Sequence, residues 1–153
     1  MKYISFEEIK NHSEKICKQL DNNFDCVIGI AKGGAIPATL IAYQLSTPTF
    51  KTVQIKSYSD DKERYKTHFS SGTLSLFEEL SKYNKVLLVD DLADSGKTLM
   101  DFMTLYNNLS SIITLPTITT ACLFYKSKSQ FKPDYYAEEI DPETWLVFPW
   151  ENE

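Results

Sequence analysis

Short apolar runs alternate along this chain with segments whose apolar residues recur at helical spacing. Cys26–Ala31 contains only apolar residues and glycine and runs into a tight Lys-Gly-Gly loop, which predicts a buried strand. Lys85–Val89, in which four of the five residues are aliphatic, is the clearest strand candidate. Thr117–Tyr125 is a further β-rich run. Shorter strands are expected around Phe50, Val53 and Ile55, at Tyr135–Tyr136 and at Trp145–Phe148.

Three other segments have the pattern of helices. Ser5 followed by Glu8 is the signature of a capping box, and apolar residues from Phe6 to Leu20 follow it at near-helical spacing. Ala35–Leu45 predicts a second helix and Lys97–Leu109 a third, whose apolar residues lie on one face.

Strands that alternate with helices predict an α/β fold with a parallel sheet and flanking helices. We expect a single domain over residues 1–153, because the chain contains neither a linker nor an internal repeat. The polar stretch Ser57–Gly72 is long enough to form a mobile loop. Ligands of parallel sheets bind beyond the carboxyl ends of the strands. The two unusual loops, after Ala31 and after Val89, are expected at such ends.

Composition narrows the class of protein. The 42% hydrophobic and 24% charged residues are typical of a globular protein, and 21 acids against 16 bases argue against nucleic-acid binding through bulk charge. The first eight residues do not resemble a signal peptide, and the longest uncharged stretch, 102–125, is too polar for a membrane span. Neither the cysteines nor the histidines have zinc spacing. We therefore expect a soluble, cytoplasmic protein.

The densest chemistry follows the clearest strand. Asp90 and Asp91 end the apolar run, and Asp94 precedes a small, hydroxyl-rich turn that opens a helix. Backbone N–H groups at a helix N-terminus, together with the Ser95 and Thr98 hydroxyls, suit a phosphate. The paired carboxylates instead suit ribose hydroxyls and a hydrated Mg²⁺, which both favour oxygen partners. The segment thus predicts a phosphate site beside a sugar site.

Three other interpretations of this segment are weaker. Gly96-Lys97-Thr98 resembles the end of a P-loop, but that motif requires a glycine where Asp91 stands, and this acid would repel a phosphate chain. Paired acids after a strand also occur in phosphoacceptor receiver domains, which the glycine-containing turn does not support. Asp-Ser-Gly alone could cap a helix, yet three acids with a hydroxyl-rich turn exceed what a cap requires.

The whole segment resembles the phosphoribosyl diphosphate signature of the type I phosphoribosyltransferases. That signature has four apolar residues, Asp-Asp, two small or apolar residues, Asp-Thr/Ser-Gly and a later Thr. The resemblance extends over nearly the whole chain to the short xanthine–guanine and hypoxanthine enzymes, which act on 6-oxopurines. Ile28–Pro37 is similar to their pyrophosphate loop, Lys56–Tyr58 to the start of their lid, and Thr144–Glu151 to their base-binding tail. The resemblance implies a parallel sheet with flanking helices, a mobile lid loop and a small C-terminal hood.

The resemblance also implies roles for individual residues. Asp90 and Asp91 would hold the ribose 2- and 3-hydroxyls and Mg²⁺, partly through water. Asp94 would lie near N7 of the purine as general acid or base. Lys126 would donate to the purine O6 and Trp145 would stack on the ring. The family often has a non-proline cis peptide in the pyrophosphate loop. The other residues implied in substrate binding are Lys32 and Gly33 for pyrophosphate, Ser57 and Tyr58 in the lid, Ser95, Gly96, Lys97 and Thr98 around the 5-phosphate, and Leu146 beside Trp145.

The implied activity is transfer of a 5-phosphoribosyl group from phosphoribosyl diphosphate to N9 of hypoxanthine, guanine or xanthine, with Mg²⁺ as cofactor. Relatives of this kind are homodimers or homotetramers. Two alternatives stay open: an RNA-binding regulator on the same scaffold, which the negative net charge disfavours, and an enzyme for another base. Lys126, next to Ser127 and Lys128, could instead be a surface charge, and Trp145 and Trp150 could be core residues. Arg64 and Lys66 receive no role.

Overall fold

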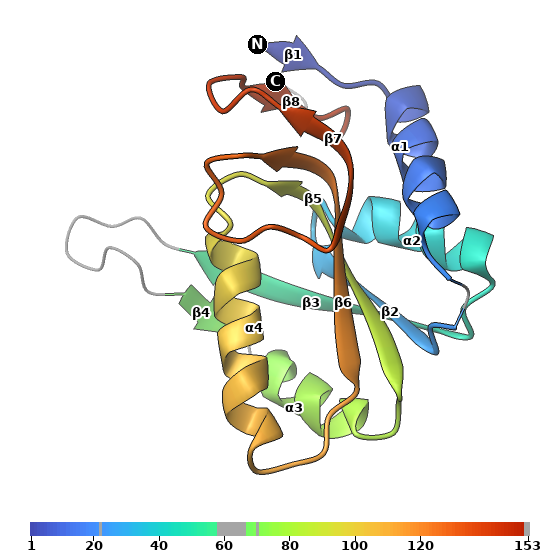
Figure 1. Cartoon of the computed structure of the whole chain (residues 1–153), viewed down its shortest axis with the longest axis vertical. Helices are drawn as coiled ribbons and strands as arrows, with labels where there is room; N and C mark the ends of the chain where they lie inside the picture. The colour runs from blue at the N-terminus through green and yellow to red at the C-terminus, as the bar shows by residue number, and fades with distance from the viewer. Residues whose placement is uncertain (22, 58–66, 70, 152–153) are drawn as a thin grey trace.

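The computed structural model describes residues 1–21, 23–57, 67–69 and 71–151, and Figure 1 shows helices packed on both faces of a twisted sheet. The order of its six strands is β4-β3-β2-β5-β6-β7. All neighbours pair in parallel except β3 and β4, so the predicted parallel sheet is confirmed and carries one antiparallel edge strand. The strands are β2 (Cys26–Ala31), β3 (Thr49–Ser57), β4 (Thr67–Phe69), β5 (Lys85–Ala93), β6 (Thr117–Lys126) and β7 (Tyr135–Ile140).

In the described residues, α1 and α2 cover one face of the sheet and α3 and α4 cover the other (Figure 1). Along β5, Leu87 and Val89 belong to the apolar cluster beneath α1 and α2, whereas Val86 and Leu88 belong to the cluster beneath α3 and α4. Burial on both faces explains the continuous apolar run of this strand. In the described residues, no helix has both the length and the apolar character needed to cross a bilayer. The helices are α1 (Phe6–Gln19), α2 (Ala35–Leu45), α3 (Ser71–Leu80) and α4 (Lys97–Ser110).

The strongest sequence signals are confirmed. The strand at Cys26–Ala31 and the helix at Ala35–Leu45 have the predicted bounds. The capping box also forms, since the Glu8 N–H donates to Ser5 Oγ at 3.1 Å and the Ser5 N–H donates to Glu8 Oε2 at 2.9 Å. The prediction that the central strand ends at Val89 is wrong. It continues through both aspartates because it keeps pairing with β6 to the end of β5.

The prediction of one loop over Ser57–Gly72 is wrong in part. Its described residues include β4 and the beginning of α3, a helix that the sequence analysis did not predict. Phe77, 1% exposed, anchors α3 to the core, where its ring lies 5.1 Å from that of Phe102. The central part of the expected lid, residues 58–66, lies outside the described residues.

A second, two-stranded parallel sheet joins the two ends of the chain. It consists of β1 (Lys2–Tyr3) and β8 (Leu146–Val147), and we call it the β1–β8 sheet. The Lys2 N–H donates to the Trp145 carbonyl at 2.8 Å, and the Ile4 N–H donates to the Val147 carbonyl at 2.9 Å. Figure 1 shows this sheet at the end of the molecule where both termini lie. The sequence pattern does not predict β1, so no partner strand was expected beside the tail.

Candidate functional site

The loops after β2 and β5 meet at the carboxyl ends of these two paired strands. A Cβ atom at Gly33 would overlap the Asp91 carboxylate, and one at Gly34 would lie 2.8 Å from the Asp90 Cα and 2.7 Å from the Val89 carbonyl oxygen. Only glycine fits so close to the neighbouring strand. The Ala31–Lys32 peptide bond is cis, as the resemblance implies for this loop. The structure thus brings the predicted pyrophosphate loop against the predicted sugar site.

Asp90 and Asp91 are partly buried and adjacent. The Asp91 N–H donates to Asp90 Oδ1 at 2.9 Å. Burial, and then the charge of Asp91, raise the pKa of Asp90 well above its ordinary value, and burial also raises the pKa of Asp91. In the described part of the chain, no lysine forms an ion pair with either carboxylate. The pair therefore favours the approach of a cation or of hydroxyl donors.

Glu151 ends the segment that is expected to form the base-binding tail, where it has no individual predicted role. Its charge is the smallest of the causes that act on the pKa of Asp91, and it raises that pKa. Its own carboxylate accepts a hydrogen bond from the Phe148 N–H at 3.0 Å, which closes the tail into a turn. The sequence places Glu151 far from Asp91, and only the fold brings the two together.

The turn from Asp94 to Thr98 encloses a small cavity of about 110 Å³ with the end of β5. A cavity needs about 10–15 Å³ by this kind of measure to hold one water molecule, so this one has room for a larger group. Gly96 has a φ of 77°, in the left-handed region, and begins α4. The Lys97 N–H donates to Ser95 Oγ at 3.2 Å, while the Lys97 ammonium pairs with Asp101 at 2.8 Å. The Lys97 ammonium thus pairs with a carboxylate one turn further along α4.

The loop after β6 packs on this turn. The Gln130 N–H donates to the Ser95 carbonyl at 2.7 Å. A Cβ atom at Gly96 would overlap Ser129 Oγ and lie 2.6 Å from the Phe131 nitrogen, so the close packing requires glycine as much as the positive φ does. The chain that follows Lys126 therefore holds the Asp94–Thr98 turn, which we call the phosphate turn after its predicted role.

Lys126, at the end of β6, is only 3% exposed, and its ammonium lies 3.2 Å from Asp94 Oδ1. A buried lysine is rare unless it is paired. The interpretation of Lys126 as a surface charge is therefore wrong. Lys128, about half exposed, adds a second ammonium 3.5 Å from the same oxygen. The site thus holds one carboxylate between two cations next to the phosphate turn.

The predicted tail residues are arranged differently from one another. The Leu146 side chain is buried in the core, whereas Trp145 is 66% exposed, so its ring is open to a ligand. In the described residues, no hydrogen bond, ion pair or ring contact joins Trp145 to Lys126. Trp150 stacks on Phe148 with ring centroids 4.9 Å apart, as expected of a core residue. Ser57 ends β3, and Tyr58, Arg64 and Lys66 lie outside the described residues.

The described residues contain no group of three or more His, Cys, Asp or Glu side chains placed to hold a metal ion. Mg²⁺, however, is commonly bound through one or two carboxylates together with waters and substrate phosphates. The partly buried Asp90 and Asp91, with their raised pKa values, fit that kind of site.

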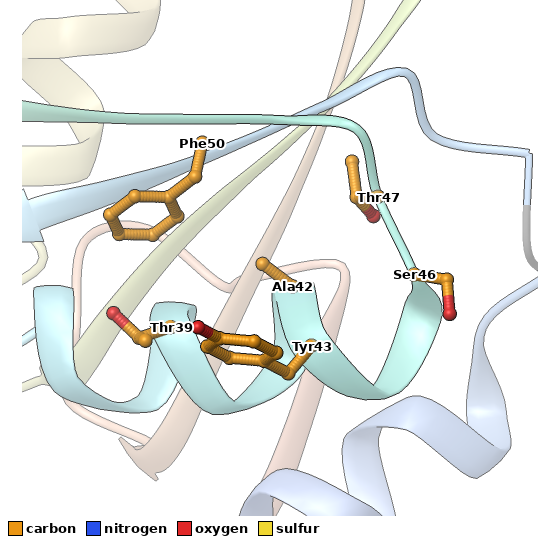
Figure 2. A pocket seen from close by; sticks show the side chains of 6 residues that line it. All are labelled: Thr39, Ala42, Tyr43, Ser46, Thr47 and Phe50. Atoms are coloured by element: carbon orange, nitrogen blue, oxygen red, sulfur yellow. The ribbon is translucent and has the colours of Figure 1, made fainter.

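A larger pocket, of about 440 Å³, lies elsewhere, between the second half of α2 and the start of β3. Figure 2 shows the rings of Tyr43 and Phe50 on facing sides of this pocket. Because it lies at the start of a strand of the parallel sheet, it is remote from the carboxyl ends where the acids meet. It contains none of the predicted site residues. The lining residues are Thr39, Ala42, Tyr43, Ser46, Thr47 and Phe50.

Comparisons with known proteins agree with this geometry. The family model described as phosphoribosyl transferase domain matches residues 3–153. The xanthine-guanine phosphoribosyltransferase of Cereibacter sphaeroides is 28% identical over 155 residues, which cover 97% of this chain and 86% of that protein. The crystal structure of a purine phosphoribosyltransferase from Pyrococcus horikoshii has a TM-score of 0.77 and 27% identity, and the match covers 99% of this chain and 94% of that one. A Helicobacter pylori xanthine-guanine-hypoxanthine phosphoribosyltransferase, 19% identical, shares the fold, with a TM-score of 0.75 over 98% of this chain and 93% of that one.

We expect the Asp90→Asn variant to be more stable than the wild type without ligand, because it removes one of two adjacent, partly buried negative charges. A gain of about 1 kcal/mol would raise Tm by about 2–4 °C in a chain of this size. Scanning calorimetry at neutral pH measures the shift, with the exposed Glu143→Gln as control. An equal or lower Tm for Asp90→Asn would show that the folded chain already compensates the pair.

Proposed function

Because this chain belongs to the family of phosphoribosyl transferase domains and is a phosphoribosyltransferase, we propose that it transfers the 5-phosphoribosyl group from phosphoribosyl diphosphate to N9 of a 6-oxopurine. The products are a purine nucleoside monophosphate and pyrophosphate, as in purine salvage. The observation that carries the proposal is the ion pair of the buried Lys126 with Asp94, beside the phosphate turn. The relatives named xanthine-guanine phosphoribosyltransferase support the same class of acceptor.

The sugar donor binds across the ends of β2 and β5 and the start of α4. The first N–H groups of a helix have no intrahelical partners and attract a phosphate, so the 5-phosphate occupies the cavity behind Ser95 and Gly96. Asp90 and Asp91 accept hydrogen bonds from the ribose hydroxyls and would hold Mg²⁺, partly through water. The backbone at Lys32 and Gly33 lies next to Asp91, where the pyrophosphate would be.

The base binds where β6 ends. Neighbouring O6 and N7 atoms on one edge of a 6-oxopurine need two groups that lie side by side, and the Lys126 ammonium and the Asp94 carboxylate are 3.2 Å apart. An ammonium has three donors and no acceptor, so Lys126 gives O6 a charge-assisted hydrogen bond. The exposed ring of Trp145 is free to stack on the purine. When the base replaces Lys126 as the partner of Asp94, the Asp94 carboxylate faces N7.

The reaction requires little covalent help from the protein. Carbon 1 of the ribose becomes oxocarbenium-like as pyrophosphate leaves and N9 attacks, so rate enhancement comes from positioning and from charge stabilisation. Bound Mg²⁺ would neutralise part of the leaving group's charge. Asp94 takes the N7 proton or stabilises the positive charge that develops on the purine. Lys126 and Trp145 keep N9 oriented towards carbon 1.

We expect a strong preference for 6-oxopurines over adenine, because adenine carries an amino donor at position 6 and would meet Lys126 donor to donor. In sites built on one such buried hydrogen bond, kcat/KM for the mismatched analogue can be lower by a factor of about 10⁴–10⁵. Steady-state kcat/KM for hypoxanthine, guanine, xanthine and adenine, with saturating donor and Mg²⁺, measures the preference. Comparable values for adenine and hypoxanthine would overturn the assignment of Lys126 and the 6-oxopurine proposal. Lys126→Met should lose activity on every 6-oxopurine, while the control Lys82→Met, in the exposed turn that follows α3, should not.

The Asp94→Asn variant should lower kcat by about 10²–10⁴, the usual contribution of a general acid or base. Donor binding should change little, because the phosphate turn that follows Asp94 keeps its backbone. Pre-steady-state kinetics, with calorimetric titration of the donor as the accompanying measurement, separates the two effects. A near-native kcat would place the proton transfer on another group.

Replacement of both Asp90 and Asp91 by Asn should weaken donor binding in the presence of Mg²⁺ far more than in its absence, because amides lack the charge that a hard cation prefers. Calorimetric titration of phosphoribosyl diphosphate with and without Mg²⁺ gives both affinities. Equal Mg²⁺-dependent affinity in the double variant and the wild type would mean that these acids are not the cation ligands.

A further inference from the structure

One carboxylate outside the proposed site binds two segments that are distant in sequence. Glu138, on the edge strand β7, accepts a hydrogen bond from the Lys2 ammonium at Oε1 (3.0 Å) and contacts His12 Nε2 at Oε2 (2.8 Å). Lys2 belongs to β1 and His12 to α1. We call these three side chains the Glu138 clamp. Burial raises the pKa of Glu138, but the hydrogen bonds with His12 and Lys2 together lower it by more, so the pKa lies below its ordinary value. The carboxylate is therefore charged at neutral pH.

Lys2 connects the clamp to the tail of the chain. Its backbone N–H donates to the Trp145 carbonyl, while its side chain reaches Glu138. In the described part of the chain β8 pairs only with β1, and each of these strands is two residues long. A sheet of two such short strands is marginal without further support. The position of the backbone at Trp145 therefore depends on where Lys2 is held.

The clamp is also packed against the strand that ends in Lys126. The ring of Phe124 lies 4.8 Å from that of His12, and the Lys2 ammonium is 5.6 Å from its centroid. Phe124 is the direct neighbour of Glu138 in the β6–β7 register. Because side chains alternate along a strand, Phe124 and Lys126 point to the same face of β6. The Glu138 clamp thus lies between the backbone at Trp145, which Lys2 holds, and the strand that carries Lys126. In the proposed function these two residues contact different parts of the base.

We propose that Glu138 is a positioning residue for base recognition: it holds β1, and through β1 the Trp145 backbone, at a fixed place relative to Lys126. This inference rests on the proposed function for its kinetic consequence. Glu138 itself does not touch the substrates. Loss of Glu138 should therefore weaken binding of the base more than binding of the sugar donor, because the donor site is built from the ends of β2 and β5.

The test is the Glu138→Gln variant of the full chain, assayed with both substrates varied. We expect KM for the purine to rise about threefold to tenfold, the scale of one or two partly exposed ion pairs, with kcat and the donor KM within about twofold of wild type. Glu139→Gln is the matched control, because it removes the same charge from an exposed neighbour on the same strand. Equal changes in both KM values, or no change in either, would overturn the proposal.

A second measurement does not depend on activity. The Lys2 and Ile4 amides donate to the tail, so their hydrogen exchange should be faster in Glu138→Gln and unchanged in Glu139→Gln. Unchanged exchange in Glu138→Gln would overturn the clamp itself. If exchange responds while the wild type turns over none of the purines, the proposed function fails and the positioning role fails with it, but the clamp stands. Should Glu138→Gln not fold, Lys2→Met replaces it, and Lys2→Arg should restore both the purine KM and the exchange rates.

Discussion

The close parallel pairing of β2 with β5 is the constraint on which the proposed active site depends. It brings the two loops that follow these strands within contact of each other, so that Gly33 and Gly34 have no room for a side chain beside Asp90 and Asp91. A larger residue at either glycine would push the loops apart and separate the proposed anion and sugar sites. Burial of β5 on both faces fixes the strand that delivers the acids. The repulsion between Asp90 and Asp91 is the cost of this arrangement, and a bound cation would relieve it.

Without ligand, only the base side of the site pairs its charges within the protein, whereas Asp90 and Asp91 have no cation beside them in the described residues. Asp94 is shared by Lys126 and Lys128, and Lys97 pairs with Asp101. Opening the Lys126–Asp94 pair for a purine leaves neither group bare in the proposed function, because the base offers an acceptor to the lysine and a ring nitrogen to the acid. Lys128 stays near Asp94 throughout. A base that cannot match both groups would leave a buried charge unpaired, which is a larger penalty than the loss of one contact.

The local structure around the proposed donor site could be predicted from the sequence because its residues are close together in the chain. Residues 90–98 are contiguous, and the strand before them and the helix after them have strong periodic patterns. The elements that were missed, β1, β4 and α3, are short or weakly patterned, and β1 and β4 are strands defined by partners elsewhere in the chain. The same limit applies to side chains. The burial of Lys126 and the approach of Glu151 to Asp91 follow from tertiary packing, and nothing in their local sequence encodes either.

The base half of the site has a different physical origin. Lys126 and Glu138 come from β6 and β7, Trp145 directly precedes β8, and Lys2 joins them from the opposite end of the chain. Such a site is assembled by weak, partly exposed interactions that act together, in contrast to the buried strands behind the sugar site. Small changes in β1 or β7 can therefore move the base-binding residues while the donor site is kept. In the proposed function, this division lets one scaffold keep the chemistry of the activated sugar and adjust which base it accepts.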